Sequence, residues 1–111
     1  MSNPSLSITE KDFSRQVEDL LGLYNWRWCH FRPAMTKTGW RTAMSGHPGF
    51  PDYVAVRARR LLLFELKSAK GRIAPAQQEW IDLLHECGDN VECYAWRPGD
   101  FDEIVSILKG S

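Results

Sequence analysis

Hydrophobic residues recur at helical spacing near the start of the chain. Thr9 is suited to cap a helix, because Asp12 then occupies the third helical position, and Gly22 is a typical stop signal. The apolar stripe between them consists of Phe13, Val17, Leu20 and Leu21. This pattern predicts a first helix with one face turned toward a core.

Shorter apolar stretches farther along the chain predict strands. They cover residues 26–31, 53–56, 61–67 and 91–96. A turn at residues 57–60 joins the second and third of these strands. Residues 33–49 show no clear periodicity, and long irregular stretches in small domains are usually functional or mobile.

Two further helices are predicted in the second half of the chain. Pro75 suits the first turn of a helix over Ala74–Cys87, and Gly88 ends it. Its expected inward stripe is Trp80, Leu83, Leu84 and Cys87. Asp100 and Glu103 resemble a capping box that opens a last helix. The inward residues of that helix are Ile104, Ile107 and Leu108. The element order predicts a single α/β domain over residues 1–111, with a mixed central sheet flanked by helices.

Length and composition suit a soluble intracellular protein. The chain has 111 residues, of which 43% are hydrophobic, so it can bury a real core. Residues 1–7 form a short polar start that we expect to be flexible. The sequence contains no apolar run of membrane-spanning length and no signal peptide, which favours a cytoplasmic location without membrane contact. Three cysteines without paired spacing fit a reducing compartment.

Charge is distributed unevenly although the formal net charge is zero. Between Arg27 and Arg72 there are ten basic residues and two acidic ones, a balance of +8, and the rest of the chain carries −8. A basic middle segment can form one positive face on a neutral protein, and such a face suits nucleic acid.

Glu65 and Lys67 interrupt the end of an otherwise apolar strand. Side chains two residues apart on a strand share a face, so both point into one site. If the turn between Ala58 and Arg59 has even length, Asp52 stands directly opposite Glu65. An odd turn would shift this register by one residue. Paired carboxylates repel unless a proton or a cation lies between them, and Mg²⁺ often uses one or two carboxylates plus substrate phosphate.

At these positions the sequence resembles the PD-(D/E)XK nuclease signature. The matching residues are Gly49–Asp52, twelve intervening residues, and Glu65–Lys67. Further segments are similar to the VRR-Nuc branch of these nucleases and to its small stand-alone phage members. They are Lys70–Gly71, Pro75–Gln77 with Trp80, Tyr94–Pro98 and Asp100–Ile104. The resemblance covers nearly the whole chain and implies a restriction-endonuclease-like core with Mg²⁺- or Mn²⁺-dependent cleavage of DNA.

The resemblance also assigns roles to individual residues. It implies that Asp52, Glu65 and the Leu66 carbonyl bind the metal ion, and that Lys67 orients water and stabilises developing charge. Gln77 matches a glutamine near the site in the following helix. The family also uses an acidic residue on its first helix. Glu10 matches best by its spacing to the apolar stripe, and Glu18 is the alternate.

Other polar residues of the basic segment are candidate DNA contacts. They are Arg32, Lys37, Arg41, His47, Arg57, Arg59, Arg60, Lys70 and Arg72. Phosphate contacts position a duplex without reading its sequence, and a chain of this size has little room for a separate reading domain. We therefore expect a nuclease that selects DNA by its structure. Branched DNA such as a Holliday junction is the favoured substrate.

Alternatives within and outside this class remain open. A flap or nicking nuclease of replication or repair, an RNA-processing nuclease, and a non-catalytic DNA-binding module of the same fold are each compatible with the pattern. Resolving a junction needs two cuts, and the many aromatic residues, among them Trp26, Trp28 and Trp40, suit an interface, so we expect a homodimer. If the protein is phage-encoded, it would act in the host cytoplasm.

Overall fold

The computed structural model describes residues 8–32, 34–41 and 44–110, with the backbone alone at 34–36 and 40–41. The expected flexibility of residues 1–7 concerns a part of the chain outside this description. The helices are α1 (Glu10–Leu23), α2 (Pro75–His85) and α3 (Phe101–Lys109), with a 3-10 turn, η2, at Pro98–Asp100. The strands are β1 (Arg27–His30), β2 (Ala34–Thr36), β3 (Gly39–Arg41), β4 (Tyr53–Arg57), β5 (Arg60–Leu66) and β6 (Val91–Trp96).

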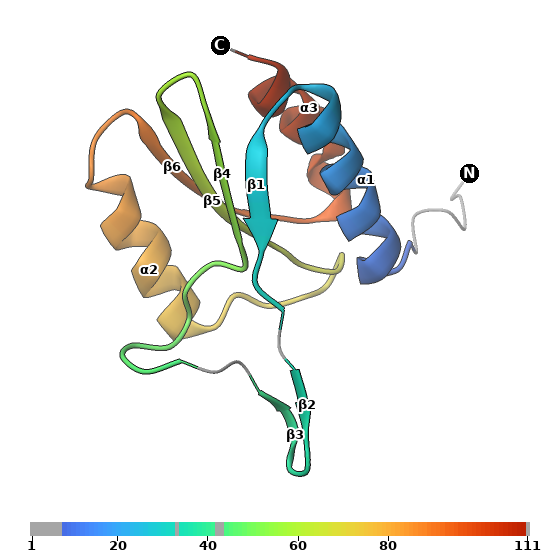
Figure 1. Ribbon diagram of the computed structural model, residues 1–111, viewed down its shortest axis with the longest axis vertical. Helices are drawn as coiled ribbons and strands as arrows, with labels where there is room; N and C mark the ends of the chain where they lie inside the picture. Colours follow the sequence, from blue (N-terminus) through green and yellow to red (C-terminus); the bar gives the residue numbers. More distant parts are fainter. Residues whose placement is uncertain (1–7, 33, 42–43, 111) are drawn as a thin grey trace.

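A four-stranded mixed sheet in the order β1-β4-β5-β6 forms the centre of the described chain. The β1–β4 and β4–β5 pairs are antiparallel, and the β5–β6 pair is parallel because α2 provides the crossover between them. Figure 1 shows α1 and α3 together on one face of this sheet and α2 on the other. The predicted mixed sheet flanked by helices is therefore confirmed.

The main core lies between the sheet and the pair α1 and α3. Phe13, Val17 and Leu21 of α1 are fully buried, as the helical spacing predicted, and Ile104 and Leu108 of α3 join them. Thr9 caps α1, since its hydroxyl accepts a hydrogen bond from the Asp12 amide at 3.0 Å. The two terminal helices thus enclose the apolar face of β5.

Two tryptophans that suggested an interface belong to this core. Trp26 is 5% exposed, and its indole Nε1 donates to the Leu108 carbonyl at 2.8 Å. Trp28 packs against the same cluster as a partly buried residue. The Trp40 side chain lies outside the described side chains. These aromatic residues therefore give no support to a dimer.

The inward stripe predicted for α2 was only partly right: Leu84 packs against the core, but Leu83 and Cys87 do not. Ile81 is the buried residue of this helix, whereas Leu83 is 53% exposed and Cys87 follows the helix as an exposed residue. Trp80 is turned toward the loop before β4, where its indole donates to the Pro48 carbonyl at 3.0 Å. This contact joins α2 to a distant loop, and the local apolar spacing could not reveal it.

Two other predictions require correction. The Asp100 side chain accepts from the Arg97 amide at 2.9 Å and thereby opens η2, so it makes no side-chain cap for α3. In the stretch 33–49, which was expected to be irregular, β2 and β3 pair as a small antiparallel sheet. Figure 1 shows this hairpin projecting beyond the main sheet, at the end where β4 begins and β5 finishes.

Candidate active site

The β4–β5 hairpin determines which residues meet at the end of the sheet. Ala58 and Arg59 have φ values of 48° and 72°, which gives a tight two-residue turn with Arg57 paired to Arg60. The ladder ends with Tyr53 opposite Phe64. The even-length turn and the register predicted from the sequence are confirmed. Asp52 and Glu65 are the next residues on the two chains.

Glu65 is the buried charged residue among the described side chains, with 1% exposure. Neither of its carboxylate oxygens accepts a hydrogen bond within the described part of the protein. Burial raises the pKa of Glu65, and the nearby Asp52 charge raises it further, whereas Lys67 lowers it. A buried carboxylate is costly unless a proton or a cation compensates its charge, and the Lys67 ammonium 3.2 Å away is the neighbouring cation among the described residues.

Lys67 lies beside this carboxylate and is held from a second direction. Its Nζ is 3.2 Å from Glu65 Oε2 and donates to Gln77 Oε1 at 3.0 Å. The ammonium contact with Glu65 is an ion pair whose geometry falls short of a hydrogen bond. Leu62, Phe64 and Leu66 of β5 belong to the main core on the α1 side of the sheet. Side chains alternate along a strand, so Leu63, Glu65 and Lys67 face the other side, where α2 and Gln77 lie. The shared face predicted for Glu65 and Lys67 is confirmed.

The backbone before β4 places Asp52 at the rim of the site. The Asp52 carbonyl accepts from the Phe31 amide at 2.7 Å, which ties the segment to the end of β1. Gly49 lies so close to α2 that an added Cβ would be 2.6 Å from the Ala76 carbonyl carbon, and its φ is +95°. Asp52 is exposed, yet partial desolvation raises the pKa of its carboxyl group, against the opposing effects of His30 and Lys67.

The acidic residues of α1 do not join this carboxylate pair. Glu10 is exposed in the first turn. Glu18 lies on the other face of the sheet, where it accepts a hydrogen bond from Tyr53 Oη at 2.6 Å. Within the described residues, no three His, Cys, Asp or Glu side chains are grouped closely enough to hold one metal ion. The geometry thus presents two carboxylates. Glu18, the alternate, contacts His30, whose charge acts on Asp52.

His30 contacts Glu18 and interacts electrostatically with Asp52. Its ring stacks on Tyr53 with centroids 3.9 Å apart, and Glu18 Oε2 is 3.5 Å from its Nδ1. Arg32 Nε donates to the same nitrogen at 3.2 Å. Burial lowers the pKa of His30, and the Arg32 charge lowers it further, so the ring is neutral near pH 7 with Nδ1 as the acceptor. The histidine is a packed structural residue at the border of the site.

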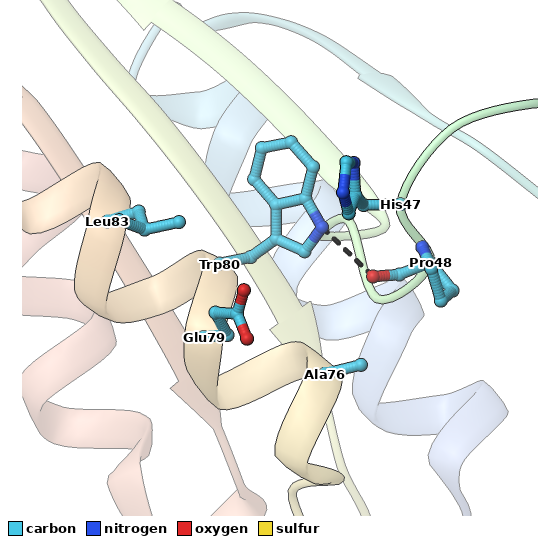
Figure 2. Close-up of a pocket in the computed structure, with 6 residues that line it drawn as sticks. All are labelled: His47, Pro48, Ala76, Glu79, Trp80 and Leu83. Carbon is cyan, nitrogen blue, oxygen red and sulfur yellow. Dashed lines mark hydrogen bonds between the residues drawn. The ribbon is translucent and has the colours of Figure 1, made fainter.

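A cleft of about 680 Å³ adjoins the carboxylates and is bordered by Asp52 and Gln77. The loop before β4 and α2 form its walls. Trp80 borders this cleft and a smaller hollow of about 240 Å³. Figure 2 shows the smaller hollow, where the Trp80 indole reaches across to the Pro48 carbonyl and His47 lies beside the ring. Phe50 packs edge-on against Trp80 with centroids 5.0 Å apart, so the loop is anchored on the helix.

Two of the arginines predicted to contact DNA make contacts that hold the fold together. Arg60 makes a double hydrogen bond to the Glu92 carboxylate at 2.7 and 2.8 Å. Arg57 donates to the main-chain carbonyls of Tyr24, Leu108 and Gly110. Both guanidinium groups lie over the Trp26 ring. Both arginines lie at the turn end of the hairpin, away from Asp52 and Glu65. Their contacts with helix carbonyls could not be predicted from the sequence of the turn.

The other predicted DNA contacts are spread along the described chain. Arg32, Lys37, His47, Arg59, Lys70 and Arg72 are exposed. Arg59 shares the turn of Arg57 and Arg60, and Lys37 lies in the β2–β3 turn. Lys70 and Arg72 follow Lys67 in the loop before α2. The Arg41 side chain lies outside the described side chains.

Sequence reasoning did not consider two basic residues that the fold brings to a hollow beside His30. Lys11 and Arg15 of α1 line a hollow of about 390 Å³ together with His30 and Arg32. Their spacing of four residues places them on one helix face, and this was the available signal. They were overlooked because they lie outside the basic middle segment of the sequence.

The donor set suits a hard divalent cation. Glu65 offers two oxygens that accept no hydrogen bond from the described residues, and Asp52 is its neighbour in register. Mg²⁺ and Mn²⁺ prefer such oxygen ligands and commonly use few protein carboxylates. Asp52 and Glu65 therefore fit the Mg²⁺ or Mn²⁺ ion that the family resemblance implied. The role of the Leu66 carbonyl stays a prediction.

Fold and site together define an α/β protein with a carboxylate–lysine centre at the open end of a central hairpin. The model of the VRR-NUC domain family matches residues 30–96, which is more than half of the chain. The chain therefore belongs to the VRR-NUC family, and membership implies a nuclease-type function in DNA processing.

A solved structure described as "VRR_NUC domain protein" has the same fold. It aligns with a TM-score of 0.51 and 18% sequence identity, over 93% of this chain and 87% of that chain. No curated protein matches the chain. None of the helices in the described residues is both long and apolar enough to cross a membrane.

Proposed function

We propose that this protein is a divalent-metal-dependent DNA endonuclease that selects branched DNA by its structure. The observation that carries the proposal is the buried Glu65 carboxylate, which accepts no hydrogen bond from the described residues and lies in register with Asp52, with Lys67 3.2 Å away. A purely structural role would be expected to supply hydrogen bonds to such a group, because a buried carboxylate that lacks them lowers stability even beside one ammonium group. Phosphodiester hydrolysis uses all three side chains.

Each residue has a distinct part in the proposed chemistry. Asp52 and Glu65 would hold Mg²⁺ or Mn²⁺. The bound ion would polarise a phosphoryl oxygen and acidify a water molecule. Lys67 would orient the attacking water and stabilise negative charge on the phosphate as it develops. Gln77 positions Lys67 through the hydrogen bond to its ammonium group.

Basic residues on two sides of the centre support a path for the phosphate backbone. Lys11, Arg15 and Arg32 border the hollow beside His30, and Lys70 and Arg72 are exposed close to Lys67 along the chain. Such contacts bind any sequence, because phosphates carry no base identity. Selectivity for branched DNA would then depend on the shape of the substrate at the projecting β2–β3 end of the protein (Figure 1).

A homodimer is part of the proposal for junction cleavage. One chain carries one Asp52–Glu65–Lys67 centre, and two opposed cuts require two centres related by a twofold axis. Sedimentation at micromolar concentrations, with and without junction DNA, tests this point. A monomer that nicks or trims flaps would favour the flap or nicking nuclease over a junction-resolving enzyme.

The central experiment compares purified protein on linear, nicked, flap and four-way-junction DNA, with Mg²⁺, with Mn²⁺ and with a chelator. We expect cleavage with metal only, and the fastest cleavage on branched DNA. Calorimetric titration with Mn²⁺ measures metal binding without reference to activity. Tight DNA binding without cleavage under every metal condition would overturn the enzyme proposal in favour of a binding module. An RNA hairpin of matched shape tests for RNA processing.

A further inference from the structure

We propose that the cleft beside the carboxylates binds one unpaired nucleobase of the DNA, next to the phosphate that is cut. This inference rests on the proposed nuclease function and adds a specific recognition site to it. The cleft has a volume of about 680 Å³, and its exposed apolar side chains include Phe31, Met44 and Phe50, which are 45%, 53% and 39% exposed. Exposed aromatic rings are the platforms on which proteins stack single bases.

The position of the cleft links it to the chemistry. Asp52 and Gln77, which belong to the carboxylate–lysine centre or position it, also line the cleft. A nucleotide with its phosphate at Glu65 and Lys67 therefore has its base within reach of the aromatic rings. His47 and Ser45 add polar groups at the same wall, which suit the polar edge of a base.

The cleft is formed before any ligand binds. Trp80 holds the Pro48 carbonyl at 3.0 Å, and Phe50 packs against Trp80. The close approach of Gly49 to Ala76 fixes the same loop to the start of α2. Figure 2 shows the Trp80 indole meeting the loop at Pro48, with His47 beside it. Preformed aromatic walls lower the ordering cost of binding a flat, rigid group.

A second copy of the chain is the competing occupant of this apolar surface. It is disfavoured because a partner seated there would cover Asp52 and Gln77 and thereby obstruct the active site. A nucleobase occupies the cleft while its own phosphate reaches the carboxylates. Bases in a duplex are paired and stacked, so a base enters most readily from a branch point, a nick or a single-stranded flap. The cleft thus supplies a physical basis for preferring branched DNA.

Photocrosslinking with 5-iododeoxyuridine tests the occupant directly. The analogue is placed at each unpaired position of a flap and at each position next to the branch point of a four-way junction, and crosslinked peptides are identified by mass spectrometry in the presence of a chelator. We expect crosslinks to Phe31 or Phe50 from a position at the branch point and none from the interior of a paired arm. The readout needs no cleavage, so a failure of the cleft and a failure of the nuclease proposal are distinguishable.

Substitution of Phe31 separates ring stacking from simple apolar packing. Phe31 is the suitable target because the Phe50 ring supports Trp80, whereas the Phe31 ring is 6.4 Å from Phe50. Phe31→Leu should reduce the preference for branched over linear DNA by roughly 5- to 150-fold, the equivalent of losing one base–aromatic stack. Phe31→Tyr should retain that preference, and Leu23→Ala, at an exposed residue of α1, is the matched control.

Three results would overturn the proposal. They are crosslinks that map elsewhere, an unchanged preference in Phe31→Leu, and equal losses in Phe31→Leu and Phe31→Tyr. Sedimentation of the same variants measures their oligomeric state and thereby tests whether a second copy of the chain occupies the cleft. If Phe31→Leu dissociates a dimer and the crosslinks of the parent protein map outside the cleft, the cleft is an interface between two copies of the chain.

Discussion

Gln77 and Lys67 are joined by a hydrogen bond that connects the start of α2 to the charged end of β5. The same Gln77 Oε1 accepts from the Lys67 ammonium at 3.0 Å and from the Ala74 amide at 2.8 Å. Ala74 occupies the N-cap of α2 and has no side chain that can cap it. One side chain therefore stabilises the helix terminus and positions the lysine.

The two roles of Gln77 are separable by substitution. Gln77→Ala should lower the free energy of unfolding by about 1 kcal/mol, as expected for a lost cap, and slow cleavage roughly tenfold. Adding Ala74→Ser supplies a hydroxyl cap and should restore stability without restoring the cleavage rate. Denaturant unfolding and single-turnover cleavage measure the two effects. If the double variant regains both, Gln77 acts only through the stability of α2.

Glu65→Gln should abolish metal binding and keep the fold. The substitution preserves the volume of a fully buried side chain and removes its charge, so we expect at least a roughly 100-fold loss of cleavage with native circular dichroism. Calorimetric titration with Mn²⁺ supplies a readout besides activity. Glu86→Gln, which changes one exposed carboxylate, is the matched control. A Glu65→Gln protein that binds Mn²⁺ like the parent would refute the ligand assignment.

Stability of the metal-free protein should decline as pH rises above the ordinary Glu pKa of 4.5. Burial raises the pKa of Glu65, so the folded state binds this proton more tightly than the unfolded chain does, and the free energy of unfolding falls as the group ionises. Asp52 contributes in the same direction. The opposite sign holds for Glu92, whose pKa is lowered by Arg60, so its contribution is lost at pH values below 4.5.

Urea unfolding in a chelator over a pH series measures this linkage. Glu65→Gln should flatten the decline on the alkaline side of 4.5, and Asp52→Asn should flatten it further. With excess Mg²⁺ the trend should reverse, because metal binding requires both carboxylates to be ionised. An identical pH dependence in Glu65→Gln would show that this group is not the source of the decline.

Salt dependence should distinguish basic residues that contact DNA from those that hold the fold. Arg60→Ala should lower the free energy of unfolding by about 2 kcal/mol, because it removes a charged double hydrogen bond to Glu92, and leave the salt slope of DNA binding unchanged. The pair Lys11→Gln and Arg15→Gln should flatten the salt slope and leave the free energy of unfolding unchanged. Each lost phosphate contact reduces the slope of log affinity against log salt by roughly 0.9.

Fluorescence anisotropy at several salt concentrations and urea unfolding give the two readouts. Lys109→Gln, at the exposed end of α3, is a control for the loss of one positive charge. If Arg60→Ala flattens the salt slope as strongly as the Lys11 and Arg15 substitutions, the turn end of the hairpin also contacts DNA.

The sequence by itself predicted the three helices, the strands of the main sheet and the register of Asp52 and Glu65. The apolar periodicity of α1 and the alternation along β5 are local patterns, so they predicted which face of each element is buried. The register of Asp52 and Glu65 followed from the length of one short turn, because pairing in a hairpin depends on residues close in the chain.

Only the tertiary structure decided how distant segments use their side chains. Trp80 faces a loop 32 residues away instead of the sheet, and Arg60 binds Glu92 and helix carbonyls instead of solvent. The two acidic residues of α1 also differ in their contacts, since Glu18 accepts a hydrogen bond from Tyr53 of the sheet and Glu10 is exposed. Each of these contacts joins elements that are far apart in the chain. They depend on how the helices pack on the sheet, and local sequence patterns do not encode that packing.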